Sequence, residues 1–349
     1  MSVITIVGAG MMGSAMCFPA ADRGHQVRLV GIHNRVSIEE VNRSGYHPTL
    51  KRQLPDGVKA YHIEGLGEAL DGADLVISGV SSFGARWFEE TVLPLLPEGL
   101  PVLSVTKGLE ALPDGTLEPF PIAMARRSAK RVSLNAVGGP VISFELADRQ
   151  QTEIAFCGED MEVLKTLKAM LETDYYHISL TTDIAGLECG VAMKNAYALG
   201  VALAIGLNEK QGGADAPEQY NPQAGLFAAS TREVMKLVDI MGGQKESLPF
   251  FAGDLYVTVF GGRTRRIGVL LGKGHPYREA RELLAGVTLE SVAIATLTAD
   301  AVRKLAARGL ARVEDFPLLM HIDGILNQAD PVCIPWDEFA VCSGQRLTT

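Results

Sequence analysis

The chain contains 349 residues, which is long enough for two domains with a large buried core. Hydrophobic residues make up 47% and charged residues 21%, the balance of an ordinary soluble globular enzyme. The net charge is −9 and no basic run exceeds a few residues, so binding to nucleic acid through the phosphate backbone is not expected.

The five cysteines are widely spaced and form neither a CxxC motif nor a cluster with histidine. This pattern argues against a zinc site and a disulfide framework, and it fits a reducing cytoplasm. No basic residue precedes the first apolar run, so a secretory signal is not expected. The longest uninterrupted run of apolar residues and glycine, Ala196 to Leu207, is too short to cross a bilayer. We therefore expect a cytoplasmic protein with no metal and no membrane-inserted segment.

The first thirty residues have the pattern of a dinucleotide-binding unit. Val3 to Val7 is β-branched and predicts a buried parallel strand, which leads directly into the glycine-rich segment Gly8 to Gly13. Ser14 to Arg23 is compatible with a helix, although Pro19 removes one of its hydrogen bonds, and Gln26 to Val30 predicts a second strand. A GxGxxG motif alone is weak evidence, but this strand–turn–helix–strand context disfavours the alternative of a simple glycine-rich turn.

Each glycine of the motif has a predicted task. Gly8 makes the tight turn, Gly10 lets the backbone approach a pyrophosphate, and Gly13 permits close packing of helix against strand. The helix would present backbone N–H groups, including those of Met11 and Met12, to the phosphates.

The residues after the second strand bear on the choice of cofactor. An acid that would hold the adenosine ribose of NAD is missing there, and the first acid is Glu39. Arg35 lies in this segment and could bind the 2′-phosphate of NADP, or it could be a solvated loop residue. We expect NADP or NAD, with NADP slightly favoured.

Strand-like and helix-like segments then alternate, which predicts a Rossmann-type doubly wound sheet with ligands at the carboxyl ends of its strands. Ser81 and Ser82 end one strand and Lys107 follows the next, although a lysine in such a place can be an ordinary solvated residue. The predicted strands are 73–80, 101–106, 131–137, 152–157 and 175–180, and the predicted helices between them are 83–96, 119–128 and 160–172.

Beyond residue 180 the strand signals stop. We place a boundary near Thr182 and Asp183, which gives a dinucleotide-binding domain over 1–182 and an all-helical substrate-binding domain over 183–349. The second part should contain an opening helix, a polar loop at 208–223, and helices at about 224–241, 276–285, 290–308 and 313–327.

The opening helix, Gly186 to Gly206, is apolar on nearly every face and should be buried almost all round. It nevertheless carries Lys194 and Asn195 at its centre. Gly190 and Ala198, one turn to either side, would leave an open slot around the lysine stem. A lysine on such a helix needs an acid, hydrogen bonds or a ligand, so a structural role and a catalytic role are both open at this point.

A glycine-containing stretch lies further on, between residues 251 and 266. Asp254 and Thr258 are four residues apart and would share one face of a helix. Arg263, Arg265 and Arg266 form a compact cationic patch, either a solvated charge run or a site for an anion.

A series of motifs follows one another from residue 3 to about residue 275. These are Gly8-Ala9-Gly10-x-x-Gly13, Thr106-Lys107-Gly108-Leu109-Glu110, Gly138-Gly139-Pro140 with Glu145, Met193-Lys194-Asn195, Gly253-Asp254-Leu255 with Thr258, and Gly261-Gly262-Arg263. In this combination and order they resemble the NAD(P)-dependent glycerol-3-phosphate dehydrogenases of the soluble two-domain type.

The resemblance implies a role for each matching residue. Lys194 would be the general acid/base, Lys107 would lie near the substrate oxygen, and Asp254 with Thr258 would complete a polar cluster. Substrate phosphate would be held by Arg263, assisted by Asn195 and by Thr264, which stands where the family usually has asparagine. Related sequences often have Glu-Gly where this chain has Ala285-Gly286, and Glu290 is the candidate replacement. Together with the residues inferred from the sequence pattern itself, the candidate cofactor-binding residues are Gly8, Gly10, Met11, Met12, Gly13, Arg35, Ser81, Ser82, Lys107, Ser143, Arg263 and Glu290.

The expected reaction is reversible hydride transfer between dihydroxyacetone phosphate and glycerol 3-phosphate, with a small phosphorylated substrate, no nucleic acid partner and a homodimer as the assembly. One alternative is a related dehydrogenase for another phosphorylated ketose or polyol, or for a ketoacid as in ketopantoate reductases. The other is a nucleotide-binding regulatory protein that has kept the fold without turnover.

Overall fold

A computed structural model describes residues 1–33, 35–213 and 215–339; Cys342 lies outside these residues. The chain divides into two compact units. The first comprises Met1–Glu110, Glu118–Val191 and Pro249–Asp254, and the second comprises Ala111–Leu117, Ala192–Leu248 and Leu255–Thr349. The long helices α9 (Ile184–Gly212) and α11 (Leu248–Val259) each contribute residues to both units.

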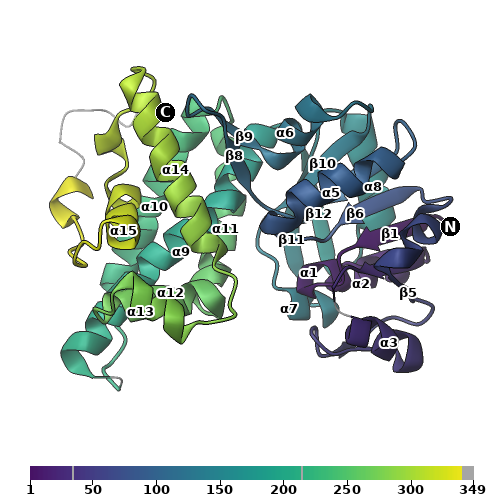
Figure 1. The fold of residues 1–349 in the computed structure, drawn as a ribbon, viewed down its shortest axis with the longest axis horizontal. Coiled ribbons are helices and arrows are strands. Elements are labelled where there is room, and N and C mark those ends of the chain that lie inside the picture. Colours follow the sequence, from purple (N-terminus) through teal and green to yellow (C-terminus); the bar gives the residue numbers. More distant parts are fainter. Residues whose placement is uncertain (34, 214, 340–349) are drawn as a thin grey trace. The chain divides into compact units, whose positions relative to one another are not determined.

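The first unit is built on a mostly parallel sheet, which within the described residues has eight strands in the order β12-β11-β10-β7-β6-β1-β2-β5 (Figure 1). All neighbouring strands are parallel except β10 and β11, which are antiparallel. The strands are β1 (Val3–Val7), β2 (Gln26–Gly31), β5 (Lys59–His62), β6 (Leu75–Ser78), β7 (Pro101–Ser104), β10 (Ser133–Gly138), β11 (Thr152–Cys157) and β12 (Tyr176–Thr181).

Helices cover both faces of this sheet, because its strands are apolar on both sides. Ile4 and Ile6 of β1 contribute to a core with α1, α2, α3 and α8, whereas Val7 contributes to a second core with α4, α5 and α6. The helices are α1 (Met11–Ala15), α2 (Cys17–Asp22), α3 (Arg35–Ser44), α4 (Leu66–Leu70), α5 (Ala85–Thr91), α6 (Phe120–Arg127), α7 (Ser143–Ala147) and α8 (Met161–Leu171).

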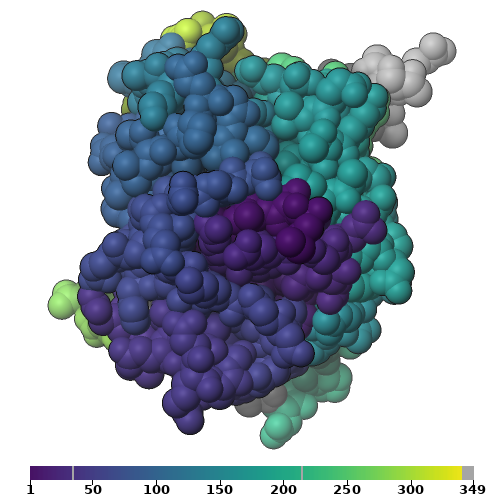
Figure 2. Space-filling view, turned by 90° about the vertical axis from the view of Figure 1, so that its right-hand side faces the viewer, coloured from purple at the N-terminus to yellow at the C-terminus, as the bar shows by residue number. Residues whose placement is uncertain are grey.

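Two short hairpins complete the strands. One is formed by β3 (Tyr46–His47) and β4 (Arg52–Gln53), and the other by β8 (Leu109–Ala111) and β9 (Leu117–Pro119). Figure 2 shows the start of the chain, in the darkest purple, at the surface of the first unit. This is the amino end of β1; the glycine-rich segment follows the opposite, carboxyl end of the same strand.

The predicted Rossmann-type sheet followed by a helical C-terminal part is confirmed, with local differences. β5 and α3, which lie between the second and third predicted strands, were not predicted. The helix predicted for Ser14 to Arg23 is interrupted at Met16, close to Pro19, whose missing N–H would otherwise bond the carbonyl of Ala15. The helix predicted for 83–96 is likewise shorter, since regular α-helix covers only Ala85–Thr91.

The second unit is helical apart from its residues of the β8–β9 hairpin. Besides its parts of α9 and α11, it contains α10 (Tyr220–Ile240), α12 (Gly262–Gly272), α13 (Tyr277–Leu283), α14 (Glu290–Ala307) and α15 (Pro317–Asn327). The predicted polar loop at 208–223 is wrong in extent, because α9 continues to Gly212 and α10 already starts at Tyr220. The stretch 251–266 forms most of α11 and the start of α12, so Asp254 and Thr258 lie on one helix as their spacing predicts.

The centre of α9 is buried almost all round, as its apolar sequence predicts. Gly200 packs against Ile322 of α15, and Gly206 against the backbone of α12, so that small residues let neighbouring helices approach closely. By length and composition α9 could cross a membrane, but most of its apolar window is buried inside the protein, as in the core helix of a globular fold.

Candidate functional site

The glycine-rich segment lies at the point of the sheet where the strand order reverses, between β1 and β6. Gly8 has φ +118°, a value that favours glycine, and a Cβ on it would lie 2.5 Å from the carbonyl carbon of Gly79. A Cβ on Gly13 would lie 2.1 Å from the oxygen of Gly8. Gly8, Gly13 and Gly79 therefore pack so closely that none of them leaves room for a side chain. Gly10 differs, because a Cβ there would meet only the Gly79 oxygen, at 3.9 Å.

This arrangement fits a dinucleotide. Gly10 is exposed and its side toward solvent is open, whereas Gly13 behind it is buried, which is the asymmetry that a bound pyrophosphate requires. Met11 and Met12 begin α1, at the edge of this open side. The predicted tasks of Gly8 and Gly13 therefore have a steric basis in the structure.

Three serines of the predicted cofactor set follow strand ends or begin helices of the first unit. Ser81 is exposed and precedes the short 3-10 helix Ser82–Gly84, three residues beyond the end of β6. Ser143 is the first residue of α7, and α7 packs against α1. All three thus belong to segments at the carboxyl side of the sheet.

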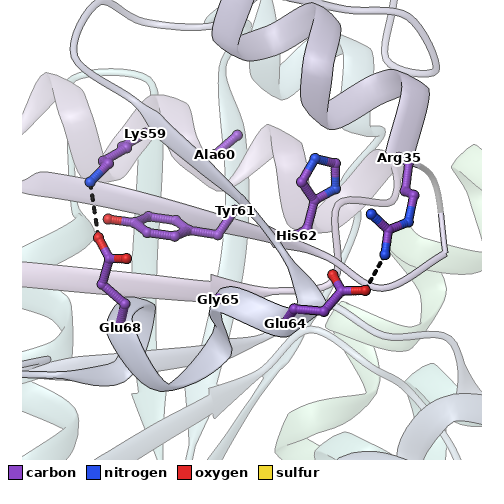
Figure 3. A pocket seen from close by; sticks show the side chains of 8 residues that line it. All are labelled: Arg35, Lys59, Ala60, Tyr61, His62, Glu64, Gly65 and Glu68. Atoms are coloured by element: carbon purple, nitrogen blue, oxygen red, sulfur yellow. Dashed lines mark hydrogen bonds and ion pairs between the residues drawn. The ribbon is translucent and has the colours of Figure 1, made fainter.

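Arg35 begins α3 and lies at an open depression of about 680 Å³ (Figure 3). Its guanidinium forms an ion pair with Glu64 on the opposite rim, and both side chains remain mostly exposed. A second ion pair joins Lys59 and Glu68, and Lys59 also lies 4.8 Å from the ring centre of Tyr61. The depression is lined by Arg35, Lys59, Ala60, Tyr61, His62, Glu64, Gly65 and Glu68.

Lys107 is held by contacts on two sides. It follows β7 in a segment that is tied to β6, since Thr106 donates its hydroxyl to the carbonyl of Val80 (2.7 Å). The Lys107 ammonium forms an ion pair with Asp254 of α11 and donates to the carbonyl of Gly139, beyond the end of β10, at 3.2 Å. The structure thus brings Lys107 and Asp254 together, and all of these residues belong to the first unit.

Glu188 of α9 was not singled out from the sequence. Its side chain is fully buried, and neither carboxyl oxygen has a hydrogen-bond partner among the described residues. Burial raises the pKa of Glu188 to about 8; the charge of Lys107 opposes this rise and that of Asp254 adds to it. An acid inside an otherwise apolar helix was the available signal, of the same kind as Lys194 on that helix.

Lys194 and Asn195 are the two half-buried residues in a fully buried stretch of α9 that runs from Leu187 to Leu203. The slot predicted beside Gly190 is not open for the lysine stem. A Cβ on Gly190 would lie 2.8 Å from the Cβ of Phe251, so the space is taken by α11. This corrects the interpretation of Gly190, whose small size serves close packing of two helices.

The predicted phosphate-binding residues lie in the second unit, around the start of α12. The Thr264 hydroxyl lies 3.5 Å from the Asn195 amide oxygen, so these two residues are neighbours. Arg263 is exposed and its guanidinium lies 3.8 Å from the carboxylate of Glu290, the first residue of α14. Thr258 lies one turn after Asp254 on α11, as the spacing predicts.

Arg265, unlike Arg263, lies against groups at the end of α11 and before α10: it donates to the Val259 carbonyl and forms an ion pair with Glu218. Among the described residues, no three histidine, cysteine, aspartate or glutamate side chains lie together as a metal site would require. The second unit therefore offers an amide and a hydroxyl that are neighbours. An exposed guanidinium belongs to Arg263, the residue before Thr264 in the chain, and groups of these kinds suit an anionic ligand such as a phosphate.

Comparison with known proteins agrees with this geometry. Residues 3–164 match the N-terminal, and residues 183–334 the C-terminal, family model of NAD-dependent glycerol-3-phosphate dehydrogenase. An NADP(+)-dependent glycerol-3-phosphate dehydrogenase of Archaeoglobus fulgidus is 32% identical over 81% of this chain and 83% of its own length. A glycerol-3-phosphate dehydrogenase [NAD(P)+] of Koribacter versatilis is 30% identical over 94% of both chains.

Solved structures agree at the level of the fold. The crystal structure of glycerol-3-phosphate dehydrogenase from Coxiella burnetii superimposes with a TM-score of 0.79 and 24% identity, over 97% of both chains. The two family models together span most of the chain in the expected order. The chain therefore belongs to the NAD-dependent glycerol-3-phosphate dehydrogenase family, whose curated members similar to it are NAD(P)-dependent oxidoreductases.

Proposed function

We propose that the protein catalyses the reversible reduction of dihydroxyacetone phosphate to glycerol 3-phosphate, with NADP(H) slightly favoured over NAD(H). The observation that carries this proposal is the placement of Lys107, just after the end of β7 and paired with the buried Asp254, in a chain of this family. A relative named NADP(+)-dependent supports the cofactor preference, as does Arg35 at the depression beyond β2 and β5.

The bound nicotinamide cofactor supplies or accepts the hydride. The chain's own groups have the remaining tasks. When a ketone carbon is reduced, negative charge develops on its oxygen, so a fixed cation and a proton donor lower the barrier. We assign the proton donor to Lys194 and the fixed cation to Lys107, which Asp254 and the Gly139 carbonyl hold in one orientation.

Recognition of the substrate phosphate is assigned to Arg263, Asn195 and Thr264. Thr264 is nearly buried and in contact with Asn195, so the pair is fixed before a ligand arrives, whereas the exposed Arg263 can move toward an anion. Binding energy from the phosphate would then orient the carbonyl for reaction. Thr258, Glu290 and the three serines Ser81, Ser82 and Ser143 are assigned supporting contacts to the substrate or cofactor.

We extend the proposal to the setting of the enzyme: a cytoplasmic homodimer in glycerol phosphate and phospholipid metabolism, with cofactor held by residues 1–182 and substrate chemistry supplied by residues 183–349. Burial of the thiols of Cys17, Cys157 and Cys189 is consistent with a reducing compartment. Size-exclusion chromatography with light scattering tests the dimer directly, and a monomer at micromolar concentration would contradict it.

The decisive experiment is an activity matrix of cofactor against substrate. NAD+ and NADP+ are each offered with glycerol 3-phosphate, with four- and five-carbon polyol phosphates, and with a ketoacid in the reducing direction. We expect the highest kcat/KM with glycerol 3-phosphate and NADP+. Turnover of a longer polyol phosphate or a ketoacid alone would replace the substrate, and cofactor binding without any turnover would indicate a regulatory protein.

A further inference from the structure

His47, in the β3–β4 hairpin, contacts the dinucleotide loop from inside the protein. Its side chain is completely buried. The ring nitrogen Nε2 lies 3.2 Å from the carbonyl oxygen of Ala9 and 3.0 Å from the hydroxyl of Ser14. Ala9 lies between Gly8 and Gly10, so this imidazole contacts the first half of the loop, and through Ser14 the helix that follows it.

The other ring nitrogen defines the protonation state. The backbone N–H of Leu50 donates to Nδ1 at 3.0 Å, so Nδ1 must carry a lone pair. The single proton of the neutral ring therefore resides on Nε2, from which it is donated to Ala9 and shared with Ser14. In a doubly protonated ring Nδ1 also carries a hydrogen, so two donors would face each other and the hydrogen bond from Leu50 would be lost.

The turn that carries the imidazole is itself rigid. Lys51 donates its N–H to the His47 carbonyl at 2.7 Å and has φ +57°, so the chain from 47 to 51 is closed on itself. The Leu50 side chain is buried in the same core as α1 and α3. The imidazole thus connects a fixed turn to a loop whose other side, at Gly10, is open.

Two arginines on the neighbouring elements pair with carboxylates rather than with the imidazole. Arg52 of β4 forms a two-pronged ion pair with Asp148, just after α7 (2.6 and 2.7 Å), and Arg43 of α3 pairs with Glu40. Burial lowers the pKa of His47 from its ordinary value, and the bond to Ala9 opposes this only in part. The ring is therefore neutral at physiological pH and charges only in acid.

We propose that His47 is a positioning residue that holds the loop Gly8–Gly13 in the conformation that binds the cofactor pyrophosphate, and that it does so only while its imidazole is neutral. This inference rests on the cofactor binding in the proposed function. A loop fixed before binding loses less conformational freedom when the cofactor binds. Protonation of His47 therefore lowers the affinity for the cofactor, although the imidazole itself does not contact the cofactor.

The test is the dissociation constant of NAD+, measured by isothermal titration calorimetry from pH 8 to pH 5. NAD+ is chosen because, unlike NADP+, it has no phosphate that titrates in this range. For the unaltered protein we expect the Kd to rise as the pH falls toward 5, with most of the change at the acidic end. His47→Gln, which keeps a donor toward Ala9 but cannot titrate, should have a Kd that is independent of pH.

His47→Asn separates the two halves of the contact. Its amide oxygen can still accept from Leu50, but the shorter side chain does not reach Ala9. We expect folding of the hairpin to be retained and NAD+ to bind several-fold more weakly at every pH. If His47→Gln does not fold, this second variant and the pH dependence of the unaltered protein decide the question.

His25 provides the matched control. It too accepts a backbone N–H at Nδ1 (Ser2, 3.1 Å) and lies beside a backbone carbonyl at Nε2 (Met170, 3.0 Å), and burial lowers its pKa as well. It lies at the opposite end of the sheet, just before β2. His25→Gln should keep the pH dependence of the unaltered protein.

The possible results are distinguishable. A pH-independent Kd in the unaltered protein, or the same pH dependence in the His47 variants, would overturn the role of His47. Failure of the unaltered protein to bind either NAD+ or NADP+ at pH 8 would instead overturn the proposed function. Circular dichroism at each pH excludes unfolding as the cause of lost binding.

Discussion

The ammonium of Lys107 and the carboxylate of Asp254 form an ion pair in which the acid is completely buried and the lysine is 15% exposed. The two residues lie 147 positions apart in the chain, on the segment after β7 and on α11. Because the Gly139 carbonyl accepts from the same ammonium, the lysine is fixed from two sides. A cation at a strand end is thereby converted from a mobile surface group into a fixed one.

Removing Lys107 should destabilise the protein as well as inactivate it. Lys107→Met leaves the buried Asp254 carboxylate without its cation, which typically costs about 3–5 kcal/mol. Urea unfolding at pH 7 measures the loss. The double variant Lys107→Met/Asp254→Leu should recover much of the stability but none of the activity, because both charges are then gone.

The exposed pair of Lys165 and Glu162 is the control for this prediction. Its ion pair has a length of 2.7 Å, but both side chains are largely in solvent, so Lys165→Met should cost less than about 1 kcal/mol. A loss of that small size for Lys107→Met would show that Asp254 is not held as a buried charge.

Much of the fold follows from local sequence patterns, because the parallel strands of the first unit are short apolar runs and its loop is a glycine fingerprint. β5 escaped prediction because its run, Lys-Ala-Tyr-His, is half polar at the edge of the sheet. The bounds of α11 were not predicted, although the spacing of Asp254 and Thr258 placed both on one helix face; Gly253 on this helix allows Pro140 to approach closely.

The candidate site was predictable residue by residue but not in its pairings. The identity of Lys107 and Asp254 came from motifs, yet nothing local indicates that they meet, because that contact depends on how α11 packs. The buried acid Glu188 and the loop contact of His47 are also tertiary. Whether a polar residue on an apolar helix is satisfied depends on neighbours that are distant in sequence.

Glu188 should make the protein less stable as the pH rises. Its folded-state pKa of about 8 lies above the unfolded value near 4.5, so the folded state binds more protons between these values. The contribution of this proton to the free energy of unfolding is complete below about pH 4.5. It decreases by on the order of 1 kcal/mol per pH unit as the pH rises, and it is lost once the pH has passed through 8.

The measurement is the free energy of unfolding at several pH values for the unaltered protein and for Glu188→Gln. The glutamine variant should be progressively more stable than the unaltered protein from pH 5 to pH 8. Glu233 has a pKa raised to about 7 by burial, but its carboxylate accepts from Leu318, Leu319 and Tyr197. Glu233→Gln should therefore destabilise, and an equal gain from both variants would contradict this reasoning.

Arg35 should influence the choice between NADP and NAD. Its ion pair with Glu64 is at the surface, with side-chain exposures of 64% and 60%, so a 2′-phosphate can displace the carboxylate at a cost of less than about 1 kcal/mol. Arg35→Ala should raise the KM for NADP+ roughly tenfold, the equivalent of one phosphate–guanidinium contact, and leave that for NAD+ nearly unchanged.

Glu64→Gln is the counterpart, because it frees Arg35 and should lower the KM for NADP+ alone. Arg86, which pairs with Glu90 on α5, provides a control arginine of similar exposure. Should Arg35→Ala and Arg86→Ala give the same ratio of kcat/KM for the two cofactors, Arg35 has no part in the preference.

Lys194→Ala should separate catalysis from cofactor binding. The lysine is half-buried in the stretch 187–203 of α9, which is otherwise buried apart from Asn195, so its charge is either structural or used by a ligand. Loss of a general acid/base should lower kcat by about 10²–10⁴-fold, while the Kd of the cofactor stays within a factor of about three. Lys210→Ala, on the same helix but exposed, should leave both unchanged.

Alanine also removes the packing of the lysine stem. Lys194→Met keeps most of that volume, so it tests the amine alone. A folded Lys194→Met protein with normal kcat would exclude the catalytic role, and a variant pair that both unfold would mark Lys194 as a structural charge.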